Sequence, residues 1–397
     1  MALKWPQDVC VAGIGTSAAF AFDLGKSPLA VQTEAFVAAL EDAGLSRDDV
    51  DGVVTAHGSP FGVDYDEFAV TAGLHCRWAT QLWSHGRWAT NMVAEAAMAV
   101  RGGLASVVAV VNTSTTGRAY GRHLRSLGGG ARESARDVGG GHGEWEIHGL
   151  ETPGAATALV AQRYMDKYGA TQDDLAEIPL AQRRSAALND MAIMRGKPMD
   201  RQSYFSEPHM VGPFRRADYC LSNEGATCLL LTSRQRAASL RQPGVVVAGV
   251  AGLQASRDDS VLFARAGLGV GIGADYPFDA APYEEIYAAS GVDRQSVDGL
   301  YVYDSFSSNV WMVLERFGFC AEGEAPKFLA ERGLDIGSPM PVNSNGGLLS
   351  EAHLLGLGHL VEMTRQLRGT AGPRQIPGAA ALQWATPIGD SLIFTRS

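Results

Sequence analysis

The stretch from Val342 to Glu362 brings together residue types that can do chemistry on a carbonyl compound. Asn345, Gly346 and Gly347 form a two-glycine turn, and His353 follows six residues after it. Glycines leave backbone N–H groups unobstructed, so such a turn can approach a ligand closely. A histidine beside it can donate a hydrogen bond to a developing oxyanion or carry a proton. The pattern therefore makes His353 a candidate catalytic group beside a turn that can approach a ligand.

A second set of reactive side chains stands fifty residues upstream, in the tetrapeptide "YDSF". The phenol of Tyr303 can donate a hydrogen bond and, where its pKa is lowered, act as a general base. Asp304 could orient that phenol or balance a neighbouring charge. We predict Tyr303, Asp304 and His353 as the catalytic residues.

The cysteines do not suggest a covalent framework. Five of them, an odd number without paired spacing, are scattered along the chain at positions 10, 76, 220, 228 and 320. Disulfide frameworks and zinc sites need closely paired cysteines or cysteine and histidine clusters. We therefore expect reduced thiols and no metal site.

Composition places the chain among soluble globular proteins. It has 397 residues, of which 46% are hydrophobic and 19% charged, which is enough for two core-forming units. The N-terminus lacks the pattern of a secretory signal, and no run of eighteen apolar residues occurs. We expect a cytoplasmic protein without a membrane segment. The net charge of -10 argues against a nucleic-acid partner.

An internal repeat indicates how the reactive residues are positioned. The segment "AGLSRDDVDGVV", from Ala43, resembles "SGVDRQSVDGLY", from Ser290. Each copy follows an amphipathic helix and leads into a β-rich run. The repeat predicts two similar α/β halves, residues 1–242 and 243–397, with the join near Pro243-Gly244.

Strands and helices alternate in the first half, which predicts a largely parallel sheet covered on both faces. We expect strands at 9–14, 53–56, 107–111 and 227–231 and a helix at about 89–100. An insertion at about 118–218 is too long for a plain connection and must form a subdomain. Its glycine-rich part, 126–145, is typical of a loop, while "QRYMDKYG" and "PLAQRRSAALN" are typical of helices.

The insertion differs in charge from the rest of this acidic chain. Acidic and basic residues are nearly balanced within it, and it contains two arginine pairs, Arg183-Arg184 and Arg215-Arg216. Guanidinium groups bind phosphates well, so these four arginines are our candidates for an anionic ligand. The alternative is that they form an ordinary solvated surface.

Several segments together resemble the thiolase superfamily, and within it the lipid-transfer-protein branch. The motifs are "NSNGGLLSEAHLLG", "YDSFSSNVWMVLERFGFCAEGEAPKFL" and "DYCLSNEGATCLLLTS", and the similarity covers nearly the full length. The resemblance implies a five-layered αβαβα fold of two pseudo-repeated halves with a long inserted loop subdomain. It also implies coenzyme A as part of the substrate, with no separately bound cofactor, and it assigns the four arginines to the CoA phosphates.

The chain departs from the family where the nucleophilic cysteine should stand. Family spacing places that cysteine at Gly86, beside His85, and the nearest cysteine is Cys76. The second family cysteine is also missing from "QWATPIGDSLIFTRS", which contains Gly389. Ser84 could be proposed instead, although a serine at such a turn is more often a capping residue. Without a thiolate there is no acyl-enzyme, which argues against the thiolase or ketoacyl-synthase reaction. The resemblance assigns Gly86, His85 and Gly389, together with Asn345, Gly346 and Gly347, to oxyanion and substrate binding.

A tyrosine at position 303 without a nucleophilic cysteine resembles the thiolase-like aldolases that cleave side chains of steroid CoA thioesters. A retro-aldol reaction needs a base for a β-hydroxyl proton and donors for the thioester enolate, and no covalent intermediate. Those aldolases tend to have tyrosine where His353 stands, and their further active-site tyrosine has no counterpart near Gln254. The acyl group and the direction of reaction therefore remain open.

Two other functions compete with this hypothesis. One is an acyltransferase or Claisen-type condensing enzyme of a lipid or natural-product pathway, which requires a nucleophile. The other is a non-catalytic subunit that binds acyl-CoA. The resemblance further implies a homodimer formed through the first-half sheet and a small OB-fold partner with a zinc ribbon.

Overall fold

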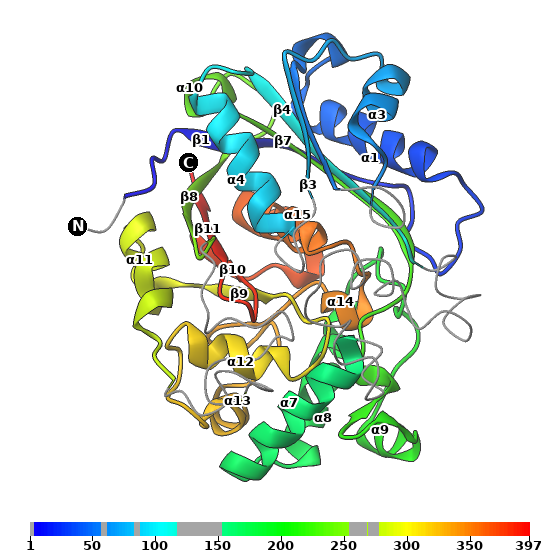
Figure 1. The fold of residues 1–397 in the computed structure, drawn as a ribbon, viewed down its shortest axis with the longest axis vertical. Helices are drawn as coiled ribbons and strands as arrows, with labels where there is room; N and C mark the ends of the chain where they lie inside the picture. The colour runs from blue at the N-terminus through cyan, green and yellow to red at the C-terminus, as the bar shows by residue number, and fades with distance from the viewer. Residues whose placement is uncertain (1–3, 57–61, 83–87, 117–152, 254–267, 269–277) are drawn as a thin grey trace, which may run out of the picture.

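Figure 1 shows the computed structural model, which describes residues 4–56, 62–82, 88–116, 153–253, 268 and 278–397. The first half contributes β1 (Val9–Thr16), β2 (Gly52–Ala56), β3 (Trp78–Leu82), β4 (Val107–Thr115) and β7 (Glu224–Ser233) to the main sheet. The second half contributes β8 (Val245–Ala251), β9 (Gly299–Val302), β10 (Ala381–Ala385) and β11 (Ser391–Arg396). These strands form one sheet in the order β3-β2-β4-β7-β1-β8-β11-β10-β9.

Helices lie on both sides of each half of the sheet. In the first half they are α1 (Pro28–Ala43), α3 (Tyr65–Ala72), α4 (Trp88–Arg101) and α10 (Arg234–Ala237). In the second half they are α11 (Glu285–Ser290), α12 (Asn309–Arg316), α13 (Ala325–Arg332), α14 (Gly347–Ser350) and α15 (Leu357–Arg368). Local sequence sets their ends: the Ser27 side chain caps α1 by accepting the Ala30 N–H, and Gly44 ends it in the left-handed conformation.

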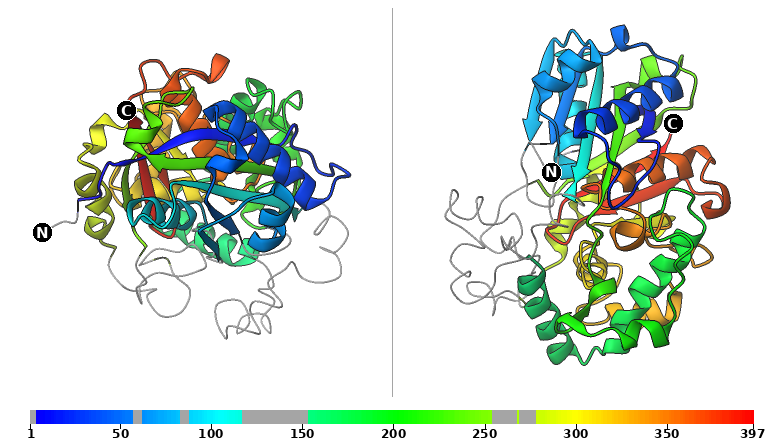
Figure 2. Two further views of the ribbon diagram at one scale, coloured as in Figure 1. Left: turned by 90° about the horizontal axis from the view of Figure 1, so that it is seen from above. Right: turned by 90° about the vertical axis from the view of Figure 1, so that its right-hand side faces the viewer.

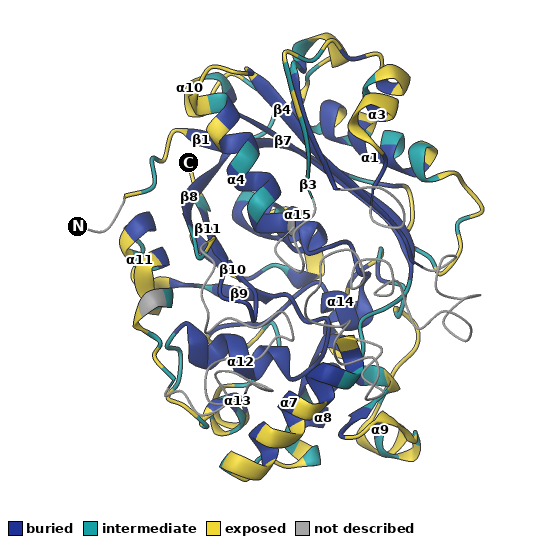
Figure 3. Ribbon diagram, viewed as in Figure 1, coloured by how far each residue is buried: buried dark blue, intermediate teal, exposed yellow. Residues whose placement is uncertain are grey.

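Three separate cores show that the molecule has five layers. The central core packs α4 and α15 between the two halves of the sheet, and both helices occupy the middle of Figure 1. A second core lies between the first-half strands and the outer helices α1 and α3. The third lies between the second-half strands and the outer helices α11 and α12. Figure 3 shows most strands of the main sheet buried, the edge strand β3 half-buried, and the outer helix faces exposed. The predicted αβαβα arrangement is confirmed.

The sheet is mixed, so the expectation of a largely parallel sheet is wrong. Among the strands that the structure describes, parallel ladders join β2 with β3, β2 with β4, and β9 with β10. In the centre, β1 pairs antiparallel with both β7 and β8, which joins the two halves. β10 and β11 are antiparallel because a short turn connects them.

The internal repeat corresponds to the same sequence of elements in both halves. α1 ends at Gly44, a 3-10 turn spans Arg47–Asp49, and β2 follows. α11 likewise ends at Gly291, a 3-10 turn spans Arg294–Ser296, and β9 follows. The strands and helices predicted for these segments are confirmed, and β9 delivers Tyr303 directly at its end.

The described part of the insertion is mainly helical. It contains α7 (Pro153–Tyr168), α8 (Gln172–Ala187), α9 (Arg201–Ser206) and a small hairpin of β5 (His209–Val211) and β6 (Phe214–Arg215). In Figures 1 and 2 these helices lie at the end of the molecule away from α1 and α3. The buried face of α8 packs against the α14 turn, so the insertion supports the segment that carries His353. The glycine-rich segment 126–145 lies outside the described residues.

Candidate active site

Tyr303 and His353 come together in the core of the second half. Tyr303 immediately follows β9, and its backbone N–H donates to the Ala385 carbonyl at 3.0 Å. Its hydroxyl lies 3.1 Å from Nε2 of His353. Both side chains are buried, with 3% and 9% of their residue surfaces exposed. Two residues that are distant in sequence and were predicted as catalytic therefore form a direct hydrogen bond.

His353 does not belong to a helix. It lies in the irregular segment between Ser350, the last residue of α14, and Leu357, the first residue of α15. Leu355 has a positive φ of 55°, which a helix does not accommodate.

The imidazole of His353 is held neutral. Burial lowers its pKa from 6.5 to about 4, against the opposing influence of Asp304, while His359 acts in the same direction as burial. A neutral imidazole has one nitrogen that donates and one that accepts. His353 can therefore take up the phenolic proton of Tyr303 or donate a hydrogen bond to its oxygen at neutral pH.

Asp304 forms hydrogen bonds to residues around this pair. Its Oδ1 accepts the Leu348 N–H at 3.0 Å and lies 3.3 Å from Nε2 of His359. Nδ1 of His359 in turn lies 3.0 Å from the side-chain nitrogen of Asn345. Because that amide can only donate, Nδ1 accepts and Nε2 carries the proton toward Asp304. The chain Asn345–His359–Asp304 thus anchors the α14 turn to the end of β9.

The backbone N–H groups of Gly346 and Gly347 donate hydrogen bonds to other groups of this chain. The Gly346 N–H donates to the Asn343 carbonyl at 2.9 Å, and the Gly347 N–H donates to Oδ1 of Asn345 at 3.3 Å. Both glycines have positive φ, 106° and 65°. A Cβ on Gly346 would lie 2.8 Å from that of Ala186 on α8. The close approach that these glycines permit is therefore made to α8.

A Cβ on Gly347 would clash with Oδ2 of Asp304 and with the side chain of Gln182 on α8. Gly389 also makes a close internal approach. It lies in the turn between β10 and β11 with a φ of 108°, and a Cβ there would clash with the Tyr283 ring. Its N–H donates to the Thr386 carbonyl at 3.0 Å. Each of these glycines thus permits close packing against a neighbouring element.

The four arginines proposed for an anionic ligand are not equivalent. Arg183 is buried and donates to Oγ of Ser350 at 3.1 Å and to the Lys197 carbonyl at 2.8 Å, so its guanidinium is engaged within the chain. Arg184 forms a two-pronged ion pair with Asp335 at 2.8 and 2.9 Å.

Arg215 is likewise engaged within the chain. Its guanidinium donates to the Glu207 carbonyl and stacks over the rings of Tyr204 and Phe205. Arg216 is exposed, and its guanidinium has no ion pair or hydrogen bond within the described part of the chain. It is the arginine of the four that is best placed to meet an anion in solution.

Burial makes four of the five cysteine thiols poor nucleophiles. It raises the pKa of Cys10 to about 11 and that of Cys220 to about 12, and it also raises the pKa of Cys228 and Cys76. A nucleophilic cysteine needs a lowered pKa. Ser84, His85 and Gly86, at the place of the missing cysteine, lie outside the described residues.

Sequence reasoning missed part of the supporting network. His359 connects Asp304 to Asn345 through its two ring nitrogens. Glu351, fully buried, accepts hydrogen bonds from Asn189 and Asn345. Glu351 lies 162 residues from Asn189 and His359 lies 55 residues from Asp304, so the sequence offers no local signal for these two contacts.

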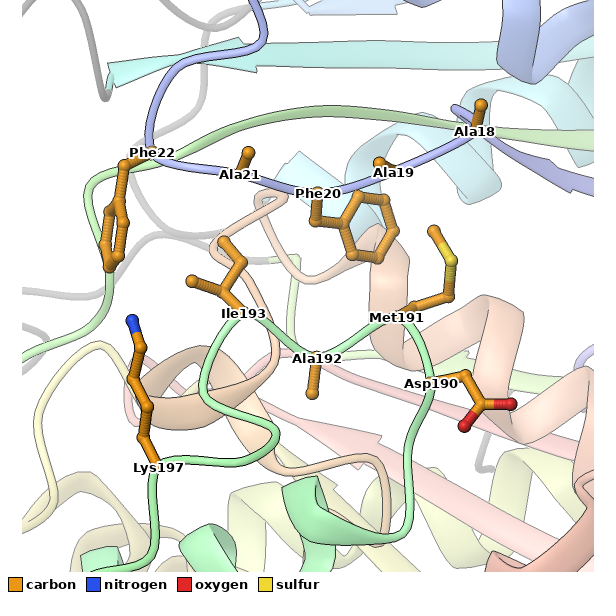
Figure 4. A pocket seen from close by; sticks show the side chains of 10 residues that line it. All are labelled: Ala18, Ala19, Phe20, Ala21, Phe22, Asp190, Met191, Ala192, Ile193 and Lys197. Carbon is orange, nitrogen blue, oxygen red and sulfur yellow. The ribbon is translucent and has the colours of Figure 1, made fainter.

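A surface groove of about 370 Å³ lies near the residues that flank His353 in the sequence. Figure 4 shows it between the stretches 18–22 and 190–193, with Lys197 pointing toward Phe22. Phe20 packs there against Ala352 and Leu354, the two neighbours of His353.

Among the helices that the structure describes, none is long and apolar enough to cross a membrane. Within the described residues, no three His, Cys, Asp or Glu side chains gather in a way that could hold a metal ion.

Comparisons with known proteins identify the family. The "Thiolase C-terminal domain-like" family matches residues 280–386. The 17-hydroxy-3-oxo-4-pregnene-20-carboxyl-CoA lyase of Mycobacterium tuberculosis is 33% identical over 368 residues, which cover 91% of this chain and 92% of that protein. The steroid side-chain-cleaving aldolase of Thermomonospora curvata is 32% identical over 376 residues, which cover 92% of each.

Among solved structures, the Ltp2-ChsH2(DUF35) aldolase superposes with a TM-score of 0.86 at 29% identity, with 98% of each chain covered. Human mitochondrial 3-ketoacyl-CoA thiolase in complex with CoA has a TM-score of 0.66 at 14% identity and shares the fold. This chain belongs to the thiolase superfamily and, within it, to the family of thiolase-like aldolases that the two bacterial relatives represent.

Proposed function

We propose that the protein is a carbon-carbon lyase that cleaves a β-hydroxyacyl-CoA carrying a bulky, steroid-type acyl group by a retro-aldol reaction. The observation that carries this proposal is the buried hydrogen bond of 3.1 Å between the Tyr303 hydroxyl and His353. The names of the two bacterial relatives, a steroid carboxyl-CoA lyase and a side-chain-cleaving aldolase, support the same substrate class.

The Tyr303–His353 pair supplies the proton transfers that this reaction needs. The Tyr303 oxygen accepts the proton of the substrate's β-hydroxyl while its own proton passes to the neutral His353 imidazole. The β-carbon becomes a ketone as the bond between the α- and β-carbons breaks. The electron pair of that bond passes into the thioester as an enolate. His353, now cationic, stabilises the enolate charge, and its proton returns through Tyr303 to the α-carbon.

The burial of His353 supports the role assigned to its imidazole. The pKa of His353 is lowered to about 4, so the imidazole is neutral and can accept a proton before the bond breaks. The negative enolate that forms beside it then favours the cationic imidazole. Asp304 and the α14 turn hold the pair in place and are not required to exchange protons.

The acyltransferase alternative is not favoured. It requires an activated nucleophile, and burial raises the pKa of four of the chain's cysteines. The direct test is to incubate the protein with a CoA thioester whose β-carbon carries a tertiary hydroxyl and a ring system, and to analyse the products by mass spectrometry. Release of a cyclic ketone and a shortened acyl-CoA supports the proposal, and an unchanged substrate opposes it.

Coenzyme A enters this proposal as part of the substrate. Arg216, exposed and without an acidic partner in the described part of the chain, is our candidate for contact with a CoA phosphate. The inserted helices would then bind the nucleotide end of the thioester while the acyl end reaches Tyr303.

We also propose two assemblies. The related structure is named as an aldolase with a DUF35 component, which supports a small partner protein, and the resemblance suggests an OB-fold with a zinc ribbon. β3 lies at the edge of the sheet, and pairing of two such edges would form the homodimer implied by the family. Light scattering of the protein alone, and then with a candidate partner, tests both.

A further inference from the structure

Two asparagines of the first half hold the segment that carries His353, which belongs to the second half. Asn223 lies just before β7, and its Oδ1 accepts the His353 backbone N–H at 2.6 Å. Its Nδ2 reaches the carbonyl of the same residue at 3.5 Å. Asn112, on β4, donates from Nδ2 to the Leu354 carbonyl at 3.3 Å. Consecutive residues of the His353 segment are thus held from the same side.

The orientation of the Asn223 amide follows from chemistry. A backbone N–H can only donate, so the atom 2.6 Å from it must be the oxygen. The nitrogen then faces the His353 carbonyl, which can only accept. One side-chain amide therefore engages both backbone groups of His353, as a neighbouring strand would.

Asn223 and Asn112 are themselves fixed. The Asn223 N–H donates to Oγ1 of Thr116 at 3.0 Å, and its carbonyl accepts from Ser114 and Thr116 at 3.1 Å each. Oδ1 of Asn112 accepts from Thr227. Both asparagines are fully buried. Buried amides with committed donors and acceptors have one orientation, and they transmit it to whatever they bind.

The segment from Glu351 to Gly356 needs such support because it has little order of its own. It forms neither helix nor strand, and it includes the positive φ of Leu355. Without external hydrogen bonds, the direction of the His353 side chain would be set only by packing. The distance from Nε2 to the Tyr303 hydroxyl depends on that direction.

We propose that Asn223, supported by Asn112, is a positioning residue that sets the His353 imidazole against Tyr303. This inference rests on the proposed function for its catalytic consequence. Asn223, a residue of the first half, thus influences proton transfer in the second half through its hydrogen bonds to the main chain of His353.

The first test is a double-mutant cycle on cleavage of the β-hydroxyacyl-CoA. An error of about 1 Å in placing a reacting group can cost about 100-fold in rate, so we expect Asn223→Ala to lower kcat by about 100-fold with KM little changed. If Asn223 acts through His353, the same substitution in a His353→Ala background causes less than about two-fold further loss. Full, additive losses in that background overturn the proposal.

Two variants separate positioning from general damage. Asn223→Asp keeps the acceptor for the His353 N–H and loses the donor to its carbonyl, so we expect an intermediate loss of about ten-fold. Thr113→Val is the matched control. Thr113 lies on β4 beside Asn112, is equally buried, and donates to the Gly225 carbonyl at 3.1 Å. We expect its kcat within about two-fold of the parent, and a loss equal to that of Asn223→Ala overturns the proposal.

The second test is independent of the reaction. Titration of the His353 imidazole by NMR measures a pKa that burial lowers to about 4 in the parent. Released by Asn223→Ala, the ring gains contact with water, and its pKa rises toward 6.5; Thr113→Val leaves it unchanged. An unchanged His353 pKa in Asn223→Ala overturns the positioning claim. If His353→Ala retains full cleavage activity, the proposed function fails, and the NMR titration alone decides this inference.

Discussion

Replacing Tyr303 with phenylalanine removes the proposed base and almost nothing else. The ring is buried, and it contacts Trp384 edge-on with 6.1 Å between ring centroids. Phenylalanine retains that packing and loses the hydroxyl that lies 3.1 Å from Nε2 of His353. The loss of a buried hydrogen bond costs about 1–2 kcal/mol of unfolding free energy.

The expected loss of rate is larger. Removing a general base lowers kcat by about 10²- to 10⁴-fold, equivalent to about 3–5 kcal/mol of activation free energy at about 1.4 kcal/mol per factor of ten. KM should change by less than about three-fold, because the hydroxyl acts in the transition state. Product formation from the β-hydroxyacyl-CoA by liquid chromatography and mass spectrometry gives kcat, and urea unfolding gives the stability.

Tyr301→Phe provides the matched control. Tyr301 lies two residues earlier on the same strand, is fully buried, and its hydroxyl lies 2.6 Å from Oγ of Ser344 instead of His353. It should lose similar stability and little activity. A Tyr303→Phe enzyme that remains folded and keeps kcat within ten-fold of the parent would refute the assignment of Tyr303 as base.

Three further predictions concern the surroundings of the pair. Gly347→Ala introduces a Cβ that clashes with Asp304 and Gln182 at a positive φ, so urea unfolding should show a loss of about 1–3 kcal/mol or more; an equally stable variant would contradict the packing described. Burial raises the pKa of Glu351 from 4.5 to about 7, with Glu362 adding to the effect, so ionisation of Glu351 reduces stability as the pH rises from 4.5 to 7. Glu351→Gln stays neutral, and its unfolding free energy relative to the parent should improve by up to about 3 kcal/mol between pH 4.5 and 8; a difference that is flat with pH would oppose this. Arg216→Ala should raise KM for the CoA thioester by about three- to ten-fold, more at low salt, with kcat unchanged, and an unchanged KM would remove Arg216 from the proposed CoA contact.

The sequence predicts the architecture because its signals are local. Runs of β-branched residues mark the strands, and the repeated helix, turn and strand segments around Gly44 and Gly291 recur in the structure. Strand direction in the centre of the sheet was mispredicted, because the direction of β7 depends on how the chain returns from the insertion. That path is a tertiary property without a periodic signal in the sequence.

Some residues of the candidate site are predictable from the sequence, and others are not. Tyr303 and His353 stand in motifs with recognisable residue types, and the structure brings them together. The surroundings of Arg183 are not predictable in this way, because charge alone does not reveal burial; its guanidinium bonds to Ser350 and the Lys197 carbonyl. The role of Asn223 is not predictable from the sequence, because its hydrogen-bond partners lie more than a hundred residues away.

The central claim is that this thiolase-like fold cleaves a carbon-carbon bond without an acyl-enzyme. A single-turnover reaction with a tertiary β-hydroxyacyl-CoA, quenched and examined by mass spectrometry of both protein and CoA species, tests it most directly. The account predicts one ketone and one shortened acyl-CoA per substrate consumed, with the protein mass unchanged throughout. A protein mass increased by an acyl group, or substrate that stays intact, would contradict it.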